Sequence, residues 1–362
     1  MNGVQKLRDE LKKQQVDAIL ISAVPNIIYL TGYSAFKTEE RDGFLLITSF
    51  GQYILTHALY AEAVEKEVAH FKLLEFTPEN PLREILEDLR VRNKINTLGV
   101  EEYNLNVLEY KYFKKIFKKL KGVNLSKFRN IKSHQEIEKI KKACEYTDQA
   151  FDFMLSKLDK DISEEELAFE MEIFLKTKRV NLAFETIVAF GKNSSVPHHQ
   201  TGNTIIKRVE SGFLLFDFGA KFENYCADMS RTVFLGKPTM EQKKLYQTVL
   251  EGQQKCVESI NTSLSKGRKI LGKDIEMSAR DYIKSMGFPD FPHSGHGIGL
   301  EVHEGPSLSP KSKQVIEEGM VFSIEPGIYI PGFGGVRIED LYTIQNGKLV
   351  QLTKSSKELI TI

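Results

Sequence analysis

The sequence predicts two domains of different class: an α/β domain with a mixed sheet over residues 1–130 and an α+β domain over residues 131–362. Three observations support this division. With 362 residues, the chain is too long for one ordinary hydrophobic core. Short apolar runs alternate with helical patterns in the first part, whereas long helical patterns are grouped apart from strand-like runs in the second. A polar, irregular stretch over residues 121–132 separates the two parts.

The first domain is expected to open with a charged amphipathic helix and to continue with strands and helices in alternation. The predicted strands cover residues 16–22, 26–32, 44–49, 52–58 and 97–102, and the predicted helices cover residues 81–91 and 106–120. The basic run over residues 114–121 is interpreted as a solvated helix face. This alternation predicts helices packed on a mixed sheet.

The second domain is expected to hold four helices and several antiparallel strands. Capping-box patterns at Ser133 and Ser163, each followed three residues later by Glu, predict the starts of two helices. The remaining predicted elements are a strand at 186–191, a hairpin at 211–235, helices at 240–261 and 272–286, and strands at 320–330 and 335–344.

The composition narrows the class of protein. Fifty Lys and Arg residues against forty-nine Asp and Glu residues, mixed along the chain, argue against nucleic acid or an anionic membrane as the main partner. The three cysteines, Cys144, Cys226 and Cys256, are widely spaced and indicate neither a disulfide framework nor a thiolate zinc site. The charged N-terminal helix does not resemble a signal peptide, and no apolar run approaches about 18 residues. We therefore expect a soluble, cytoplasmic protein.

Four acidic residues interrupt apolar runs, where an isolated ionised carboxylate would cost several kcal/mol. They are Asp217 in LLFDFG, Asp228 in YCADMS, Glu325 in FSIEPG and Glu339 in VRIEDL. Taken singly, each acid is explained by pairing with Arg or Lys, and Arg231 is a nearby candidate. Five of the eight histidines, His198, His199, His293, His296 and His303, lie within residues 198–303.

Taken together, the four acids and His296 form an oxygen-rich set with a single imidazole. Such a set suits Mn²⁺ first, with Co²⁺, Zn²⁺ or Fe²⁺ as alternatives, and the absence of nearby thiolates argues against a structural zinc site. Five side chains exceed what one ion needs. Because carboxylates can bridge, the economical arrangement is two ions about 3.5–4 Å apart that share a hydroxide. The sequence therefore predicts a dinuclear hydrolase.

The segments FDFGA, YCADMSRT, HSGHGIGLEVHE, SIEPGIYI and GVRIED, in this order, resemble the signature of the pita-bread metallopeptidases, specifically the branch of Xaa-Pro dipeptidase (prolidase) and aminopeptidase P. The eleven-residue step from Asp217 to Asp228 and the seven-residue step from His296 to His303 match that branch. The segment NIIYLTGY resembles the creatinase-type N-terminal domain. The resemblance thus implies a creatinase-type α/β domain followed by a pita-bread α+β catalytic domain.

The resemblance also implies a role for each candidate residue. Asp217 would hold one metal ion, His296 and Glu325 the other, and Asp228 and Glu339 both. Glu325 would take the proton from the attacking water, and the bridging hydroxide would attack the carbonyl before proline. The remaining implied residues are His303, which steadies the tetrahedral intermediate, His198 at the substrate pocket, Arg337 near the substrate and Arg231, which orients the region of Asp228.

The implied substrates are short proline-containing peptides, and the implied assembly is a homodimer. A Xaa-Pro dipeptidase is the leading hypothesis. The alternatives are aminopeptidase P, a metal-free creatinase-like enzyme and a non-catalytic peptide-binding module. Phe184, Phe190 and Tyr225 are candidates for the apolar walls of a proline pocket. Ile28 and His57 depart from the family pattern, which leaves the contribution of the N-terminal domain to substrate selection open.

Overall fold

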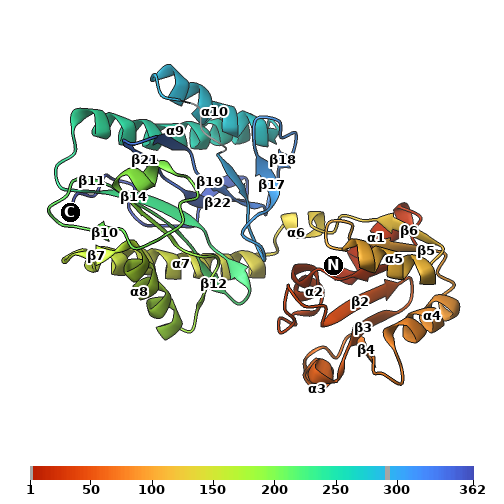
Figure 1. The fold of residues 1–362 in the computed structure, drawn as a ribbon. Helices are drawn as coiled ribbons and strands as arrows, with labels where there is room; N and C mark the ends of the chain where they lie inside the picture. Colours follow the sequence, from red (N-terminus) through yellow and green to blue (C-terminus); the bar gives the residue numbers. More distant parts are fainter. Residues whose placement is uncertain (1–2, 290–293) are drawn as a thin grey trace. The chain divides into compact units, whose positions relative to one another are not determined.

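A computed structural model describes residues 3–289 and 294–362 (Figure 1). The chain divides into two compact units, Met1–Arg129 and Asn130–Ile362. Within the described residues, no helix combines the length and the apolar character needed to cross a membrane. The first unit is α/β and the second is α+β, so the two predicted classes are confirmed.

The first unit is built on one six-stranded mixed sheet with the order β4-β3-β2-β1-β5-β6. Its strands are β1 (Ala18–Ile21), β2 (Gly43–Thr48), β3 (Gln52–Thr56), β4 (Lys72–Glu75), β5 (Thr97–Val100) and β6 (Lys119–Gly122). Its helices are α1 (Gly3–Lys13), α2 (Val24–Thr31), α3 (Ala58–Glu67), α4 (Leu82–Arg92) and α5 (Val107–Ile116), and α6 (Lys127–Asn130) follows. The β1–β2 and β2–β3 pairs are antiparallel and the others are parallel.

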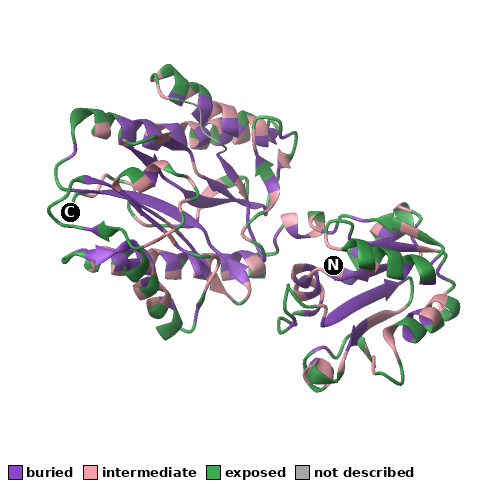
Figure 2. Ribbon diagram, in the orientation of Figure 1, coloured by how far each residue is buried: buried purple, intermediate pink, exposed green. Residues whose placement is uncertain are grey.

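Both faces of this sheet are covered, which explains why β1 and β2 are continuous apolar runs (Figure 2). Ile19 and Ile21 pack in one apolar cluster with residues of α1, α2 and α3. Ala18 and Leu20, which point to the opposite face, pack in a second cluster with α4 and α5. The central strands are therefore buried on both sides.

The strand predicted at residues 26–32 is wrong, because these residues belong to helix α2. Pro25 lies in the first turn of the helix, where its missing N–H costs nothing, and Gly32 ends the helix with a φ of 80°. The buried Ile27 and Thr31 are four residues apart, which is helical spacing. The helix predicted over 106–120 ends at Ile116, and the residues beyond it lead into β6.

The second unit places its long strands between two pairs of helices (Figure 1). The helices are α7 (His134–Ser156), α8 (Glu164–Thr177), α9 (Met240–Ser265) and α10 (Gly272–Ser285), with the 3-10 helix η1 (Gly191–Ser195). Both predicted capping boxes form, at the starts of α7 and α8. One apolar cluster joins α7 and α8 to strands β9, β11 and β14, and another joins α9 and α10 to strands β19 to β22.

The strands of the second unit form several small sheets, among them the five-stranded β17-β16-β19-β22-β23 and the three-stranded β14-β11-β9 and β13-β12-β8. Their bounds are β7 (Ile162–Ser163), β8 (Asn181–Leu182), β9 (Ile187–Phe190), β10 (Ile205–Ile206), β11 (Gly212–Phe218), β12 (Ala220–Phe222), β13 (Tyr225–Cys226), β14 (Met229–Leu235), β15 (Ile270–Leu271), β16 (Gly295–Gly297), β17 (Glu304–Leu308), β18 (Val315–Ile316), β19 (Val321–Ile324), β20 (Gly327–Ile330), β21 (Gly334–Arg337), β22 (Asp340–Gln345) and β23 (Lys348–Gln351).

The predicted hairpin at 211–235 is confirmed, since β11 and β14 pair in antiparallel register from Gly212↔Leu235 to Phe218↔Met229. The strands predicted at 320–330 and 335–344 are each divided in two. The first breaks between β19 and β20, and the second breaks between β21 and β22. The halves then pair as β19 with β22 and β20 with β21. Glu325 and Glu339 lie at these two breaks.

Candidate metal centre

A cavity in the second unit, with a volume of about 350 Å³, brings together eight of the residues that the sequence singled out for a site. These residues are His198, Asp217, Asp228, His296, His303, Glu325, Arg337 and Glu339. They come from segments far apart in the chain, and the cavity's remaining lining includes apolar side chains. The cavity lies in the size range of small-molecule sites.

The four carboxylates lie at or near the ends of strands. Asp217 is the penultimate residue of β11 and Asp228 directly precedes β14. Glu325 directly follows β19 and Glu339 directly precedes β22. In β11, Phe216 and Phe218 pack against the helices α7 and α8. Because side chains alternate along a strand, the carboxylate between them points to the opposite face.

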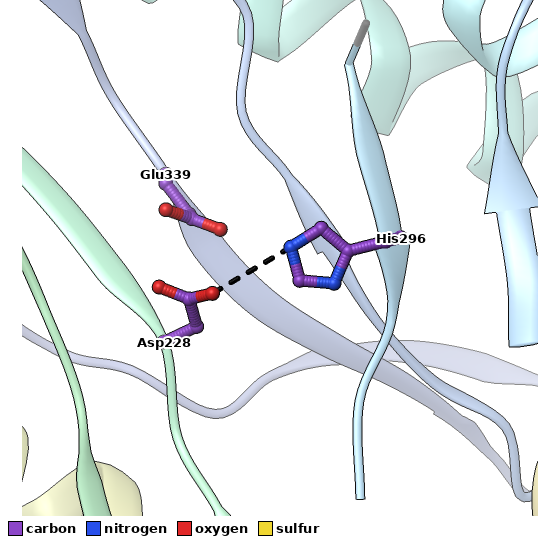
Figure 3. Close-up of side chains that lie close together, drawn as sticks. All are labelled: Asp228, His296 and Glu339. Atoms are coloured by element: carbon purple, nitrogen blue, oxygen red, sulfur yellow. Dashed lines mark ion pairs between the residues drawn. The ribbon is translucent and has the colours of Figure 1, made fainter. Parts of the chain in front are cut away.

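Three side chains form a compact cluster that could hold a metal ion: Asp228, His296 and Glu339 (Figure 3). One ligand atom of each lies within 4.8 Å of the others. Nε2 of His296 is 3.5 Å from Oδ2 of Asp228 and 3.2 Å from Oε1 of Glu325. Hydroxyl Oγ of Ser323 donates to Glu325 Oε1 at 2.9 Å, which fixes that carboxylate at the edge of the cluster.

The cluster holds more negative charge than the protein around it can stabilise. Burial, followed by the charges of Glu339 and other nearby acids, raises the pKa of Asp228 well above its ordinary value. Burial and the charge of Glu325 likewise raise the pKa of Glu339 to about 8. Burial disfavours the charged imidazole of His296, but hydrogen bonding to Glu325 outweighs it and raises the pKa of His296 to about 9. Asp228 and Glu339 thus favour protonation unless a cation lies beside them.

The donor atoms fit a divalent cation. Asp228 Oδ1 and Glu339 Oε1 are buried and have no hydrogen-bond partner among the described residues. The other oxygen of Glu339 accepts from Ser230 Oγ at 2.7 Å, which leaves the first oxygen available for coordination. Carboxylate oxygens with one imidazole nitrogen are the ligands of Mn²⁺ and similar ions. An unpaired buried oxygen is costly, and coordination by a cation would remove that cost.

Asp217 lines the same cavity but its carboxylate pairs with Arg337. Nη2 of Arg337 is 2.5 Å from Asp217 Oδ2, Nε donates to Ser230 Oγ at 2.6 Å, and Nη1 donates to the Pro197 carbonyl at 3.1 Å. Burial opposes the charge of Arg337, yet Asp217 and its neighbours raise the pKa of Arg337 well above its ordinary value. Arg337 is 5% exposed, so it acts within the wall of the cavity.

Arg231, the nearby candidate for neutralising the hairpin acids, is engaged elsewhere. Its Nη2 is 2.6 Å from Asp340 Oδ1, and its guanidinium also donates to the carbonyls of Glu339, Ser355 and Ser356. Although burial works against ionisation, Arg231 holds the pKa of Asp340 below its ordinary value. Arg231 therefore supports the backbone behind Glu339 and does not provide the charge that the cluster requires.

Three of the five predicted histidines, His198, His296 and His303, line the cavity. The ring centroids of His303 and His296 are 4.3 Å apart, at 62° between their planes. His198 lines the cavity from the loop that follows η1. His199 is paired with Glu164 instead. His293 lies outside the described residues.

Sequence reasoning missed Tyr329. Its hydroxyl is 3.0 Å from Arg337 Nη1, and burial raises the pKa of the phenol. The available signal was alternation along β20, where Ile328 is fully buried in the core and its neighbour must face the other way. Of the three aromatic residues proposed as apolar walls, Phe184 lines the cavity. Phe190 packs in the cluster with α8, and the hydroxyl of Tyr225 bonds to a glutamate of α7.

Fold and cavity together define a hydrolase of the pita-bread metallopeptidase class that carries a creatinase-type N-terminal domain. The family model described as metallopeptidase family M24 matches residues 138–346, and the model of the creatinase/prolidase N-terminal domain matches residues 4–138. The chain therefore belongs to metallopeptidase family M24.

Named relatives match over nearly the full length. The chain is 37% identical to a Xaa-Pro dipeptidase of Pyrococcus horikoshii, over 99% of this chain and 98% of the relative. A solved structure of a Xaa-Pro dipeptidase from Bacillus anthracis superposes with a TM-score of 0.90 and 31% identity, over 99% of both chains. An X-Pro aminopeptidase from Thermotoga maritima superposes with a TM-score of 0.85 and 30% identity, over 96% of this chain and 98% of that chain.

Proposed function

We propose that this protein is a dinuclear-metal peptidase that hydrolyses the Xaa-Pro bond of dipeptides. The observation that carries the proposal is the cluster of buried acids with His296, in which Asp228 and Glu339 each keep one carboxylate oxygen without a hydrogen-bond partner. The similarity to a dipeptidase of Pyrococcus horikoshii over nearly the whole length supports the substrate class.

Five side chains would hold the two ions. Asp217 would bind one ion, His296 and Glu325 the other, and Asp228 and Glu339 both. Mn²⁺ is the ion that we propose, with Co²⁺, Zn²⁺ and Fe²⁺ as alternatives, because the donor set is mainly carboxylate. When bound, paired divalent ions supply a strong nucleophile at neutral pH and positive charge for the developing oxyanion.

The protein's own side chains would handle the proton and the substrate. Glu325 is the proposed proton acceptor, since its Oε1 is oriented by Ser323 and lies at the edge of the cluster. His303, next to His296, would steady the tetrahedral intermediate, and His198 would contact the substrate from another wall. Arg337 would keep Asp217 oriented toward the cavity.

The apolar part of the cavity would receive the proline ring. Phe184, Ile187 and Val302 supply this part of the lining. Proline has no N–H, so a peptidase that relied on backbone hydrogen bonding along its substrate would lose a contact at this position. Shape and apolar contact would therefore select the substrate.

An aminopeptidase P activity on longer Xaa-Pro peptides is the second candidate, supported by the likeness to the aminopeptidase from Thermotoga maritima. The cavity, with a volume of about 350 Å³, is large enough to hold a dipeptide. We expect faster hydrolysis of Met-Pro than of a matched Xaa-Pro-Xaa tripeptide after reconstitution with Mn²⁺. Preference for the tripeptide would replace the dipeptidase assignment with the second candidate.

Elemental analysis separates these enzymes from the metal-free alternatives. We expect about two Mn²⁺ ions per chain after chelation, reconstitution and removal of free metal. The same protein should be tested on a dipeptide panel with Mn²⁺, Co²⁺ and Zn²⁺. Metal content near zero would instead support a creatinase-like enzyme or a peptide-binding module.

A further inference from the structure

A buried acid–histidine pair lies outside the proposed metal ligands. Glu164, the first residue of α8, is fully buried, and its Oε2 is 2.9 Å from Nε2 of His199. The side chain of His199 is only 16% exposed. A charged carboxylate is rarely buried so completely without a structural or functional reason.

Glu164 organises the loop that follows β9. Its Oε1 accepts hydrogen bonds from the backbone N–H of Phe190 at 2.7 Å and from Nδ2 of Asn193 at 2.9 Å. Together with His199, these donors come from the start, the middle and the end of the segment 190–199. One carboxylate thus fixes the course of the whole loop, with hydrogen bonds strengthened by its charge.

The loop holds His198 from both sides. The carbonyl of Pro197, directly before His198, accepts from Nη1 of Arg337 at 3.1 Å. His199, directly after His198, is held by the carboxylate of Glu164. Arg337 also pairs with Asp217, so the position of the loop is connected to a proposed metal ligand. With its neighbours fixed, the imidazole of His198 has only its own side-chain rotations left to place it in the cavity.

We propose that Glu164 and His199 are positioning residues that place the imidazole of His198 against the bound substrate. The proposal rests on the proposed peptidase function of the cavity. Its physical basis is that small errors in the placement of a substrate-contacting group slow a reaction strongly. Glu164 bonds to the neighbouring histidine, His199, so its effect would reach His198 through the backbone that joins the two residues.

The first test is kinetic. We expect His199→Ala to lower kcat/KM for Met-Pro about tenfold with unchanged Mn²⁺ stoichiometry, and His199→Gln, which keeps a donor, to restore part of the loss. Glu164→Gln should also lower kcat/KM. The matched control is Glu170→Gln on the same helix, because Glu170 is 35% exposed and pairs only at the surface, with Lys157. This control should leave kcat/KM unchanged.

A double-mutant cycle tests whether the pair acts through His198. If it does, adding His199→Ala to His198→Ala should cost much less than it costs in the wild type. Equal losses in the two backgrounds would overturn the proposal, because they would indicate a general disturbance of the fold. Wild-type kcat/KM in His199→Ala would overturn it as well.

A second readout does not depend on catalysis. In histidine-ring NMR spectra of the metal-free protein, with the His198 signal identified from the His198→Ala variant, we expect that signal to shift or broaden in His199→Ala and to remain unchanged in Glu170→Gln. An unchanged His198 signal in His199→Ala would contradict the positioning role. If the signal responds but the wild type cleaves no Xaa-Pro peptide, the proposed function fails and the positioning contact stands.

Discussion

Both units of the protein bury carboxylates, but the two units satisfy them in different ways. In the first unit, Glu101 is 5% exposed and accepts from the backbone N–H groups of Ser22 at 2.6 Å and Ala23 at 2.8 Å. In the second unit, Asp228 and Glu339 are 4% and 2% exposed, yet each keeps one oxygen without a partner among the described residues. The acids are therefore similarly buried, but only Asp228 and Glu339 keep an oxygen without a hydrogen-bond partner among the described residues.

The difference shows what distinguishes a candidate metal ligand from a structural acid. Glu101 lies beside the start of α2, where backbone N–H groups lack partners within the helix. Asp228 and Glu339 instead lie near other acids, whose charges add to the effect of burial. Burial alone raises the pKa of Glu101 too. Unpaired oxygens that face further acids, and not burial, indicate the cation site.

The largest effect should come from removing an acid of the second unit. We expect Asp228→Ala or Glu339→Ala to lose both Mn²⁺ ions, or nearly so, because each is proposed to contact two ions at once. Hydrolysis of Met-Pro should fall by more than about 10³-fold. Metal analysis and kinetics on the purified variants measure both quantities. Normal metal content and activity would remove the contrast between the two kinds of buried acid.

The pH dependence of stability should differ between metal-free and metal-loaded protein. In the metal-free protein the pKa of Glu339 is raised from 4.5 to about 8. A raised folded-state pKa means that the folded state holds the proton more tightly than the unfolded state does. The free energy of unfolding of the metal-free protein should therefore be greatest near pH 5 and should fall by about 3 kcal/mol as the pH rises to 8.

The raised pKa of His296, about 9, acts in the same direction, since its stabilising contribution is lost as the pH rises through that value. Urea denaturation of chelated protein between pH 5 and 9 measures the trend. Glu339→Gln should make the unfolding free energy less dependent on pH. Saturating Mn²⁺ should reverse the trend, so that stability rises with pH, because protons compete with the metal for the same ligands. A flat profile in the metal-free wild type would contradict the assigned charge state of the cluster.

A smaller effect is expected for a cavity residue outside the ligand set. His303→Ala should lower kcat for Met-Pro by about 10²-fold, because the variant loses the group that is proposed to steady the tetrahedral intermediate. Two Mn²⁺ ions per chain should remain, in contrast to the variants of the bridging acids. Loss of metal in His303→Ala would move this residue into the ligand set.

Much of the second unit could be predicted from its sequence because its signals are local. Capping boxes mark the starts of α7 and α8, and polar residues within apolar runs mark the four acids. The break in each C-terminal strand could not be predicted, since apolar runs continue across Glu325 and Glu339. Only the pairing of β19 with β22 and of β20 with β21 shows that each run belongs to two sheets.

The first unit was harder to predict where tertiary contacts decide the local structure. The segment around Ile27 has the β-branched, apolar composition of a strand, yet it forms α2. The start of that helix is fixed by the carboxylate of Glu101, which lies about 75 residues farther along the chain. Tyr329 escaped prediction for a similar reason, because its partner Arg337 reaches it from another strand.

The smallest effect should come from the structural acid of the first unit. Glu101→Gln keeps the side-chain volume but places an amide NH₂ where one carboxylate oxygen now accepts hydrogen bonds from Ser22 and Ala23. We expect a loss of about 2 kcal/mol in the unfolding free energy of the first unit, because buried donors lose their acceptor. Urea denaturation followed by a probe in that unit measures this loss.

Metal content and kcat of the folded Glu101→Gln protein should match the wild type. If Glu101→Gln instead lowered the Mn²⁺ content, as is expected of Glu339→Ala, burial and not unpaired oxygens would be the feature that the two acids share.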